Sequence, residues 1–515
     1  MKYLRTNTVR NVSVTFSVLA LGALFFTAPA RAADDPVADA NAGITGPILT
    51  AADVQAVVAK VAASVGLPFT IAVTDRQGDV LAVYQKANAP ALAQANFGVM
   101  ADSKDVAIAL ARTASFFSNS QAPLSSRTVR YISGIHFPPG IMFTGSAALY
   151  GIENTNRGCP FFANFIPGQE VPPSMKLDGT PGLGILTGKA DLLDSDPFAV
   201  NPGGVPLFKN GNTLVGGVGV AGVPPDIAEY AAFNGFALFP LNPIPDPQVV
   251  FIDGIALPFV DNTSPPSGVS AGTADGSYYL GPIDAPKSAP EGYMVAPHAG
   301  PVGGLSADEV RQIVENTIAQ GNRTRAVIRL PLGTRAKFVI AVADLDGQLL
   351  ALNRMPDATI FSIDVAVAKS RNVIFFSGPN RTDADLPGLP MGTAVTNRTI
   401  EFGTEPLYPL GIDFTSPGPF FNLYKFDTLN PCTQGSQAPN PYQNGVVFFP
   451  GALPLYRNGV LVGGLGVSGD GVEQDDFATA AGAAGFEAPE SIRADHQILR
   501  GVRLPYIKFP RNPVD

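Results

Sequence analysis

Histidine and cysteine are scarce in this chain of 515 residues. The three histidines, His136, His298 and His496, stand far apart in no spacing that zinc ligands adopt, and no H-E-x-x-H pattern occurs. These absences argue against a zinc enzyme. The two cysteines form no C-x-x-C pair, which argues against a dithiol redox motif as well.

Positive charge is also limited. The formal net charge is −9 at pH 7, and no cluster of lysine and arginine stands downstream of the amino-terminal segment. Binding to nucleic acid requires a basic surface, so we expect no nucleic-acid partner. An acidic membrane surface would repel the protein for the same reason.

An apolar run opens the chain. Lys2, Arg5 and Arg10 precede the apolar residues 12–26, and the small-residue pattern Ala30-Arg31-Ala32 follows. The run is shorter than the roughly 20 residues that a transmembrane helix needs, so we interpret residues 1–32 as a secretory signal peptide. We expect an exported protein, periplasmic or extracellular, with no membrane span in its mature chain. Its formal net charge would be about −13.

The two cysteines lie in different halves of the chain. Export would bring Cys159 and Cys432 into a compartment where disulfides form. A bond between them would tie the two halves together. Two unpaired buried thiols are the alternative interpretation, and the sequence leaves both open.

One segment occurs twice. Residues 206–222 read PLFKNGNTLVGGVGVAG, and residues 454–469 read PLYRNGVLVGGLGVSG. This self-similarity indicates a tandem duplication. We predict two homologous domains, at 47–260 and 305–515, joined by a linker rich in proline, glycine and serine at 261–304.

Both copies predict the same elements in the same order: helix, hairpin, helix, long irregular segment, hairpin, helix. Thr50 and Ser306 are the predicted N-caps of the first helices. The other segments follow in pairs: hairpin turns at 75–78 and 344–347, second helices at about 102–117 and 363–376, irregular segments at 137–202 and 408–450, and last helices beginning near 226 and 475. This order predicts an α+β fold in which helices pack on an antiparallel sheet.

The glycines of the repeat match G-x-G-x-x-G, a pattern of dinucleotide-binding proteins, at 217–222 and 464–469. In those proteins the glycines follow a parallel strand and open a helix. Here they lie in the second strand of a hairpin that turns at Asn210-Gly211 or Asn458-Gly459. We therefore interpret them as strand glycines that permit a close approach to the backbone, by the first helix or by a flat ligand.

The ordered set of an Asp-x-x-Gly hairpin, an alanine-rich helix and the repeated hairpin resembles the GlcG/HbpS-like family of heme-binding or heme-degrading proteins. The resemblance covers both copies and is most specific at 215–222 and 462–469, which continues into Glu473-Gln474-Asp475. It implies small α+β domains that associate into oligomers and bind heme or another tetrapyrrole. Family members usually carry a basic residue in the second helix, where this chain has Lys369 in copy two and Leu110 in copy one.

Heme carries propionate groups, which cations recognise. Arg112 and Arg371 recur at matching positions of the two copies, as do Arg127 and Arg398. Their guanidinium groups can hold carboxylates by paired hydrogen bonds, and Lys369 is a further candidate from the resemblance. The alternative is that these arginines pair with Asp105 or Asp364, or with a helix terminus.

His136 is the candidate iron ligand. It precedes Phe137 in copy one, whereas copy two has Leu407 at the corresponding place, so binding through His136 would make the copies unequal. A structural histidine is the alternative. We interpret Asp75 and Asp344 as turn formers rather than catalytic acids.

Taken together, these features predict an exported tandem-domain binder of heme or a related tetrapyrrole, in which any degradation of heme is incidental. The alternative is a structural or assembly module. Its fused copies would form an intramolecular pseudo-dimer or a homo-oligomer, and its long segments rich in proline and aromatic residues would bind a protein partner.

Overall fold

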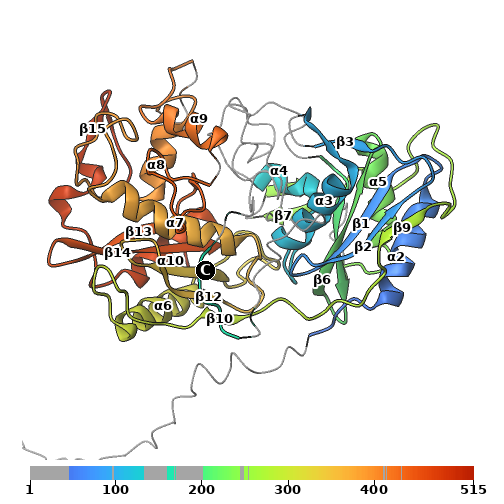
Figure 1. The fold of residues 1–515 in the computed structure, drawn as a ribbon, viewed down its shortest axis with the longest axis horizontal. Helices are drawn as coiled ribbons and strands as arrows, with labels where there is room; N and C mark the ends of the chain where they lie inside the picture. Colours follow the sequence, from blue (N-terminus) through green and yellow to red (C-terminus); the bar gives the residue numbers. More distant parts are fainter. Residues whose placement is uncertain are drawn as a thin grey trace, which may run out of the picture.

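The structure of this chain is a computed structural model. It describes residues 46–95, 98–132, 159, 161–167, 169, 201–243, 249–252, 255–409, 412, 414–430 and 432–514. The predicted signal peptide and His136 lie outside the described residues. Figure 1 shows two halves side by side, one from each copy of the duplication.

Each half contains a five-stranded sheet in which every pair of neighbouring strands is antiparallel. The first sheet has the order β5 (Gly204–Lys209), β6 (Thr213–Ala221), β1 (Thr70–Asp75), β2 (Val80–Gln85) and β9 (Ser277–Leu280). The second has the order β10 (Gly292–Val295), β12 (Leu349–Arg354), β11 (Phe338–Ala343), β14 (Val460–Gly469) and β13 (Ala452–Arg457). The α+β fold predicted from the sequence is confirmed.

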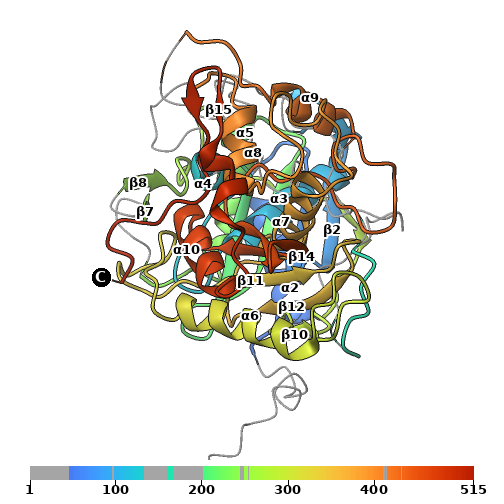
Figure 2. The same cartoon turned by 90° about the vertical axis from the view of Figure 1, so that its left-hand side faces the viewer.

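Helices cover both faces of each sheet. Alternate strand residues point to opposite sides, and in the central strands β1 and β11 the residues on both sides are buried. In the first half, Ile71 and Val73 face the core formed with α2 (Ala51–Ser64) and α5 (Pro225–Phe236), while Ala72 faces α3 (Ser103–Phe117). The second half repeats this plan with α6 (Ala307–Gly321) and α10 (Val472–Gly482) on one face and α7 (Ser362–Ser377) on the other (Figure 2).

The repeated glycines bring the second helix of each copy close to the sheet. A Cβ added at Gly219 would lie 2.1 Å from the carbonyl oxygen of Ala107 on α3, and one at Gly466 would lie 2.2 Å from that of Ala366 on α7. No side chain fits there. The expectation of close approach is therefore correct, but the approaching element is the second helix and not the first.

Shorter elements complete each half. The helices α4 (Ser126–Ile132) and α8 (Asn397–Thr404) correspond to each other, and each donates a threonine hydroxyl to the closing segment of its own copy. Thr128 Oγ1 donates to the Pro258 carbonyl over 2.8 Å, and Thr399 Oγ1 to that of Pro505 over 2.7 Å. The remaining elements are β3 (Leu92–Gln94), β4 (Met100–Asp102), β7 (Val249–Ile252), β8 (Ile255–Pro258), α9 (Phe421–Leu429), η2 (Glu490–Ile492), η3 (Ala494–His496), β15 (Ile498–Leu499) and β16 (Val502–Arg503).

The segment 261–304, predicted from its composition to be a linker, contributes a strand to each sheet. Its first strand, β9, pairs with β2 at the edge of the first sheet, and its second strand, β10, pairs with β12 at the edge of the second. The segment therefore joins the two halves and also completes both of them.

The two halves contact each other through a buried ionic cluster around Asp357. Its carboxylate accepts hydrogen bonds from Arg76 of the first half (2.8 Å) and Arg329 of the second half (2.6 Å). Ser120 of the first half adds its backbone N–H and its hydroxyl group, the latter at 2.9 Å. Both guanidinium groups are buried, so removal of the Asp357 carboxylate would leave buried positive charge without its partner.

Apolar contacts lie beside the ionic cluster. The ring of Phe117 at the end of α3 stacks on that of Phe361, with centroids 4.2 Å apart. The N–H of Ile360 donates to the carbonyl of Phe116 over 3.0 Å. Among the helices that the structure describes, none is long and apolar enough to cross a membrane.

Candidate functional site

Arg112 and Arg371 occupy equivalent buried positions on α3 and α7. Each Nε donates over 2.8 Å to the carbonyl of the glycine that closes the nearby hairpin turn, Gly78 in copy one and Gly347 in copy two. Burial lowers the pKa of Arg112 to about 10 and that of Arg371 to about 9. Both arginines brace a turn, and their binding to a ligand stays a prediction.

Asp75 and Asp344 form those turns. Oδ1 of Asp75 accepts the N–H groups of Gly78 (2.7 Å) and Asp79 (2.8 Å), and Oδ1 of Asp344 accepts that of Gln348 (2.9 Å). Burial raises the pKa of both carboxyl groups. These contacts agree with the interpretation of both residues as turn formers.

Arg127 and Arg398 are paired with carboxylates. Arg127 makes a two-point contact with Glu229, at 2.6 Å and 3.0 Å, and Nε of Arg398 lies 2.5 Å from Asp476. Although burial opposes it, the Asp476 carboxylate raises the pKa of Arg398. These pairs tie α4 to α5 and α8 to α10, and their carboxylates are not the Asp105 and Asp364 that the alternative interpretation named.

Lys369 is buried in an ion pair that copy one lacks. Its Nζ donates to Asp475 Oδ2 over 2.9 Å and to the carbonyl of Val467 over 2.8 Å. Burial raises the pKa of Asp475 to about 7, although Lys369 acts in the opposite direction. At the matching positions copy one has Leu110 and Ala228, an apolar pair in place of the ionic one.

The histidines are not assembled into a metal site in the described part of the chain. His298 Nδ1 lies 3.0 Å from the carbonyl of Ala296, and His496 Nε2 lies 3.5 Å from Glu490 at the surface. No group of three or more histidine, cysteine, aspartate or glutamate residues with metal-binding geometry occurs among the described residues. The assignment of His136 to iron stays a prediction.

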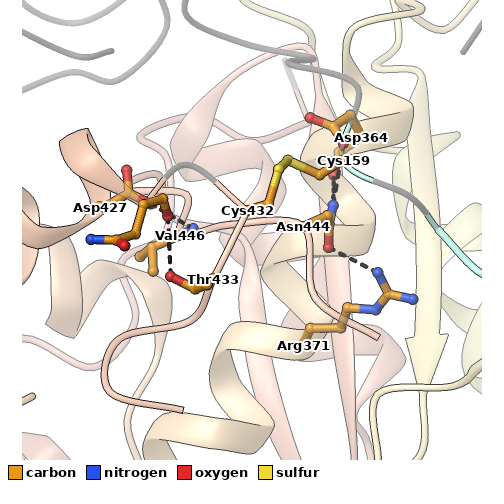
Figure 3. Close-up of a disulfide and its surroundings, with 9 residues drawn as sticks. Cys159, Asp364, Arg371, Asp427, Cys432, Thr433, Asn444 and Val446 are labelled. Atoms are coloured by element: carbon orange, nitrogen blue, oxygen red, sulfur yellow. Dashed lines mark hydrogen bonds between the residues drawn. A yellow bond between two sulfur atoms is a disulfide. The ribbon is translucent and has the colours of Figure 1, made fainter. Parts of the chain in front are cut away.

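A disulfide between Cys159 and Cys432 joins the two halves (Figure 3). Beyond Cys159, the first copy's residues 161–167 lie against the second half. The carbonyl of Phe161 accepts a hydrogen bond from Nη2 of Arg371 over 2.5 Å, and the N–H of Ile166 donates to the carbonyl of Met294 on β10 over 2.8 Å. The long irregular segment of copy one therefore reaches into copy two.

Asn444 connects this region to α7. Its Oδ1 accepts from Arg371 Nη1 over 3.0 Å, and its Nδ2 donates to the Asp364 carboxylate over 3.2 Å (Figure 3). Sequence reasoning missed Asn444, because it stands in no motif and lies 73 residues from Arg371 in the chain. The one sequence signal for this region was that Arg371 recurs as Arg112 at the matching position of copy one.

Ser270 also escaped sequence reasoning. It is the central residue of a G-x-S-x-G pattern from Gly268 to Gly272, the pattern of a hydrolase nucleophile. The structure places it in irregular chain, where its carbonyl accepts the N–H of Gly66 over 2.9 Å. A nucleophile elbow needs a strand before the serine and a helix after it, so Ser270 is not one.

The described histidines and the candidate cations do not together form a complete heme site. A heme site needs an axial ligand for iron and cations for the propionates. The described histidines are His298 and His496, and their ring nitrogens face protein oxygen atoms. The candidate cations likewise contact protein oxygen atoms: Arg112, Arg127, Lys369, Arg371 and Arg398.

Curated proteins resemble part of the chain. The corrinoid adenosyltransferase PduO of Salmonella typhimurium is 30% identical over 162 residues, which are 31% of this chain and 36% of that protein. This chain thus spans about a third of that relative's length. An uncharacterised 15.0 kDa protein of Citrobacter freundii is 29% identical over 166 residues, which are 32% of this chain and 87% of that protein.

Solved structures resemble the chain at low overall similarity. A PduOC:heme complex is 22% identical, with a TM-score of 0.24, and the match covers 35% of this chain and 94% of that one. The protein ORFY of Klebsiella pneumoniae is 19% identical, with a TM-score of 0.24 and coverage of 36% and 92%. The family model described as "Haem degrading protein HbpS-like" matches residues 49–237 and 305–484. Because these two regions make up more than half of the chain and coincide with its two copies, the chain belongs to the HbpS-like family.

Proposed function

We propose that this chain binds heme or a related tetrapyrrole and that any degradation of heme is incidental to binding. The observation that supports this function is the match of a heme-degrading family's model to both copies. The chain is then a binding protein rather than a dedicated enzyme. Because the described histidines and the candidate cations do not complete a heme site, no chemical step is assigned to them.

Titration with hemin tests this function and the role of His136 together. Added to the mature wild-type chain, hemin should give a Soret band that shifts and saturates. His136→Ala should lose the shift if His136 is the iron ligand, while the matched variant His298→Ala should keep it, because His298 contacts the backbone carbonyl of Ala296. An unchanged spectrum in His136→Ala would return this residue to a structural role.

We also propose that the protein is exported. The basic residues, apolar run and small residues of the first 32 positions support this, and the Cys159–Cys432 disulfide suits an oxidising compartment. Amino-terminal sequencing of protein from the exported fraction should begin at Ala33. Protein that keeps Met1 and stays inside the cell would contradict the proposal.

A second candidate function is the binding of a protein partner by the long segment of copy two. Phe414 is 99% exposed and Leu429 is 82% exposed, which is unusual for large apolar side chains. A crosslinker placed at Ser416 should capture one defined partner, identified by mass spectrometry. Adding the double substitution Phe414→Ser and Leu429→Ser should abolish capture of this partner. Equal capture with and without the two substitutions would contradict a role of these side chains in partner binding.

A further inference from the structure

Arg371 is a buried cation whose hydrogen-bond acceptors are all uncharged. Among the described residues, its three nitrogens donate to the carbonyl of Gly347, the side-chain oxygen of Asn444 and the carbonyl of Phe161. The nearby Asp364 carboxylate accepts a hydrogen bond from Asn444 and attracts the Arg371 guanidinium group by its charge, without being one of those three acceptors. A guanidinium group binds a carboxylate more strongly than it binds a neutral oxygen. Arg371 therefore has capacity for an anion.

Phe161 is the acceptor that can leave most easily. Gly347 belongs to the hairpin turn of copy two and Asn444 is buried in the same half, whereas Phe161 comes from the other copy. Around it, residues 161–167 form neither helix nor strand. Among the described residues, their removal from the second half would break the hydrogen bonds of Phe161 and Ile166 and the packing of their partly buried side chains, but no helix or strand.

The disulfide fixes this segment in place. Cys159 stands two residues before Phe161, so its bond to Cys432 keeps the Phe161 carbonyl close to Arg371. Cys432 is only partly buried and lies in irregular chain just beyond α9. Cys432 is thus the more exposed of the two cysteines, and we expect a reducing agent to attack its sulfur.

We propose that Cys159 and residues 161–167 are an internal plug on the second half, that the Cys159–Cys432 disulfide latches it, and that its release frees Arg371 for a carboxylate of the ligand. Below, "the plug" means Cys159 and residues 161–167. The claim about the ligand rests on the proposed heme binding, whereas the claim about the latch does not.

Opening requires a dithiol reductant. One thiolate of the reductant attacks Sγ of Cys432, the sulfur–sulfur bond breaks, and Sγ of Cys159 leaves as a thiolate that takes up a proton. The second thiol of the reductant then displaces Cys432 from the mixed disulfide. The protein gains two thiols, and the reductant becomes a disulfide.

Hydrogen exchange measured by mass spectrometry tests the latch without any ligand. In the oxidised protein, the N–H of Ile166 is bonded to Met294, so the peptide covering 161–167 should exchange slowly. Reduction, or the double variant Cys159→Ser and Cys432→Ser, should speed that exchange at least about tenfold while β11 stays protected. Equal exchange in the oxidised and reduced protein, with both forms folded, would overturn the latch.

A second pair of variants opens the plug with the disulfide intact. Ile166→Pro removes the N–H that bonds to Met294, whereas Ile166→Ala shortens the same side chain and keeps the N–H. Ile166→Pro should therefore expose the plug more than Ile166→Ala does. Equal exchange in the two variants would show that the Ile166–Met294 bond does not hold the plug and would count against the proposal.

Hemin affinity tests the role of Arg371. The reduced wild-type chain should bind hemin at least about tenfold more tightly than the oxidised chain, and Arg371→Gln should abolish this difference. Equal affinity of both forms, with faster exchange on reduction, would overturn the role of Arg371 and leave the latch. Binding to neither form would refute the proposed function and, with it, the claim about the ligand.

Discussion

Two residues distinguish the buried centres of the copies. Lys369 and Asp475 form an ion pair in copy two, and Leu110 and Ala228 fill the same place in copy one. An apolar pair can replace a buried ion pair without loss of stability, because the cost of removing both charges from water disappears with them. The chain therefore fills the same buried position with an ion pair in copy two and with apolar side chains in copy one.

The first prediction concerns this pair. Lys369→Leu leaves the Asp475 carboxyl buried without a partner and should lower the free energy of unfolding by about 3–5 kcal/mol at pH 8. The double variant Lys369→Leu with Asp475→Ala reproduces copy one and should recover most of that loss. Chemical denaturation of both variants measures the difference, and a double variant no more stable than the single one would contradict this account.

The pH dependence of Lys369→Leu has a defined sign. Burial raises the pKa of Asp475 to about 7, above its value of about 4 in an unfolded chain. A raised pKa means that the folded state binds the proton more tightly, so the contribution of Asp475 to stability is complete below about pH 4 and is lost as pH rises toward 7. Lys369 opposes this rise in pKa, so without it the loss of stability should continue to higher pH than in the wild type.

The second prediction concerns the repeated glycines. Gly466→Ala would place a methyl group 2.2 Å from the carbonyl oxygen of Ala366, so α7 must move away from β14. We expect a loss of about 1–3 kcal/mol in the free energy of unfolding. Gly66→Ala is a suitable control, because its added Cβ would lie 3.4 Å from the carbonyl of Ala271, an ordinary contact. Equal stability of the two variants would contradict the close approach.

At the scale of elements, the turn that contains Asp357 provides a contact between the two halves that the matching turn of copy one cannot provide. Asp357 and Asn88 occupy matching places after the second strand of each copy, and both have positive φ, +61° and +64°. Asparagine and aspartate tolerate this backbone equally well. Of these two side chains, only that of Asp357 carries a charge, and it forms an ion pair with Arg76 of the other half.

The third prediction concerns Asp357. Asp357→Asn introduces an amide like that of Asn88 in copy one and should lower the free energy of unfolding by roughly 3 kcal/mol. This value is near the low end of the range for breaking a buried ion pair, because the Asp357 side chain is 25% exposed. Although burial opposes them, Arg76 and Arg329 lower the pKa of Asp357. Its contribution is therefore complete above about pH 4 and lost as pH falls further. Denaturation at pH 7 and pH 3 should show a smaller difference at pH 3, and an equal difference would contradict this assignment.

Local sequence patterns predicted the main elements well. The second helices, expected at about 102–117 and 363–376, are observed at Ser103–Phe117 and Ser362–Ser377. Caps, periodicity and Asn-Gly turns act between neighbours in the chain, so they can be recognised without the fold. Strands β9 and β10 carry no such pattern, because each is a four-residue edge strand within a composition typical of a linker.

Contacts distant in the sequence were harder to predict at the candidate site. Pairing the copies identified Arg112, Arg371, Arg127 and Arg398, but their partners depend on the fold. The acidic partners Glu229 and Asp476 stand 102 and 78 residues away from their arginines. The Phe161 carbonyl is a backbone group, which carries no sequence signal at all.

At the scale of the whole molecule, duplication provides two copies of one plan and lets them diverge. Copy two keeps the buried Lys369–Asp475 pair, and copy one extends residues 161–167 onto its neighbour. The disulfide and the Asp357 cluster join the halves at separate places. The two copies therefore form one molecule with unequal halves rather than two independent domains.

Heme binding is the central claim, and a titration of hemin into the mature chain, followed by absorption and repeated under reducing conditions, tests it most directly. The account predicts a saturable Soret shift at micromolar hemin, with one or two hemin molecules bound per chain. No saturable binding in either the oxidised or the reduced protein would contradict it.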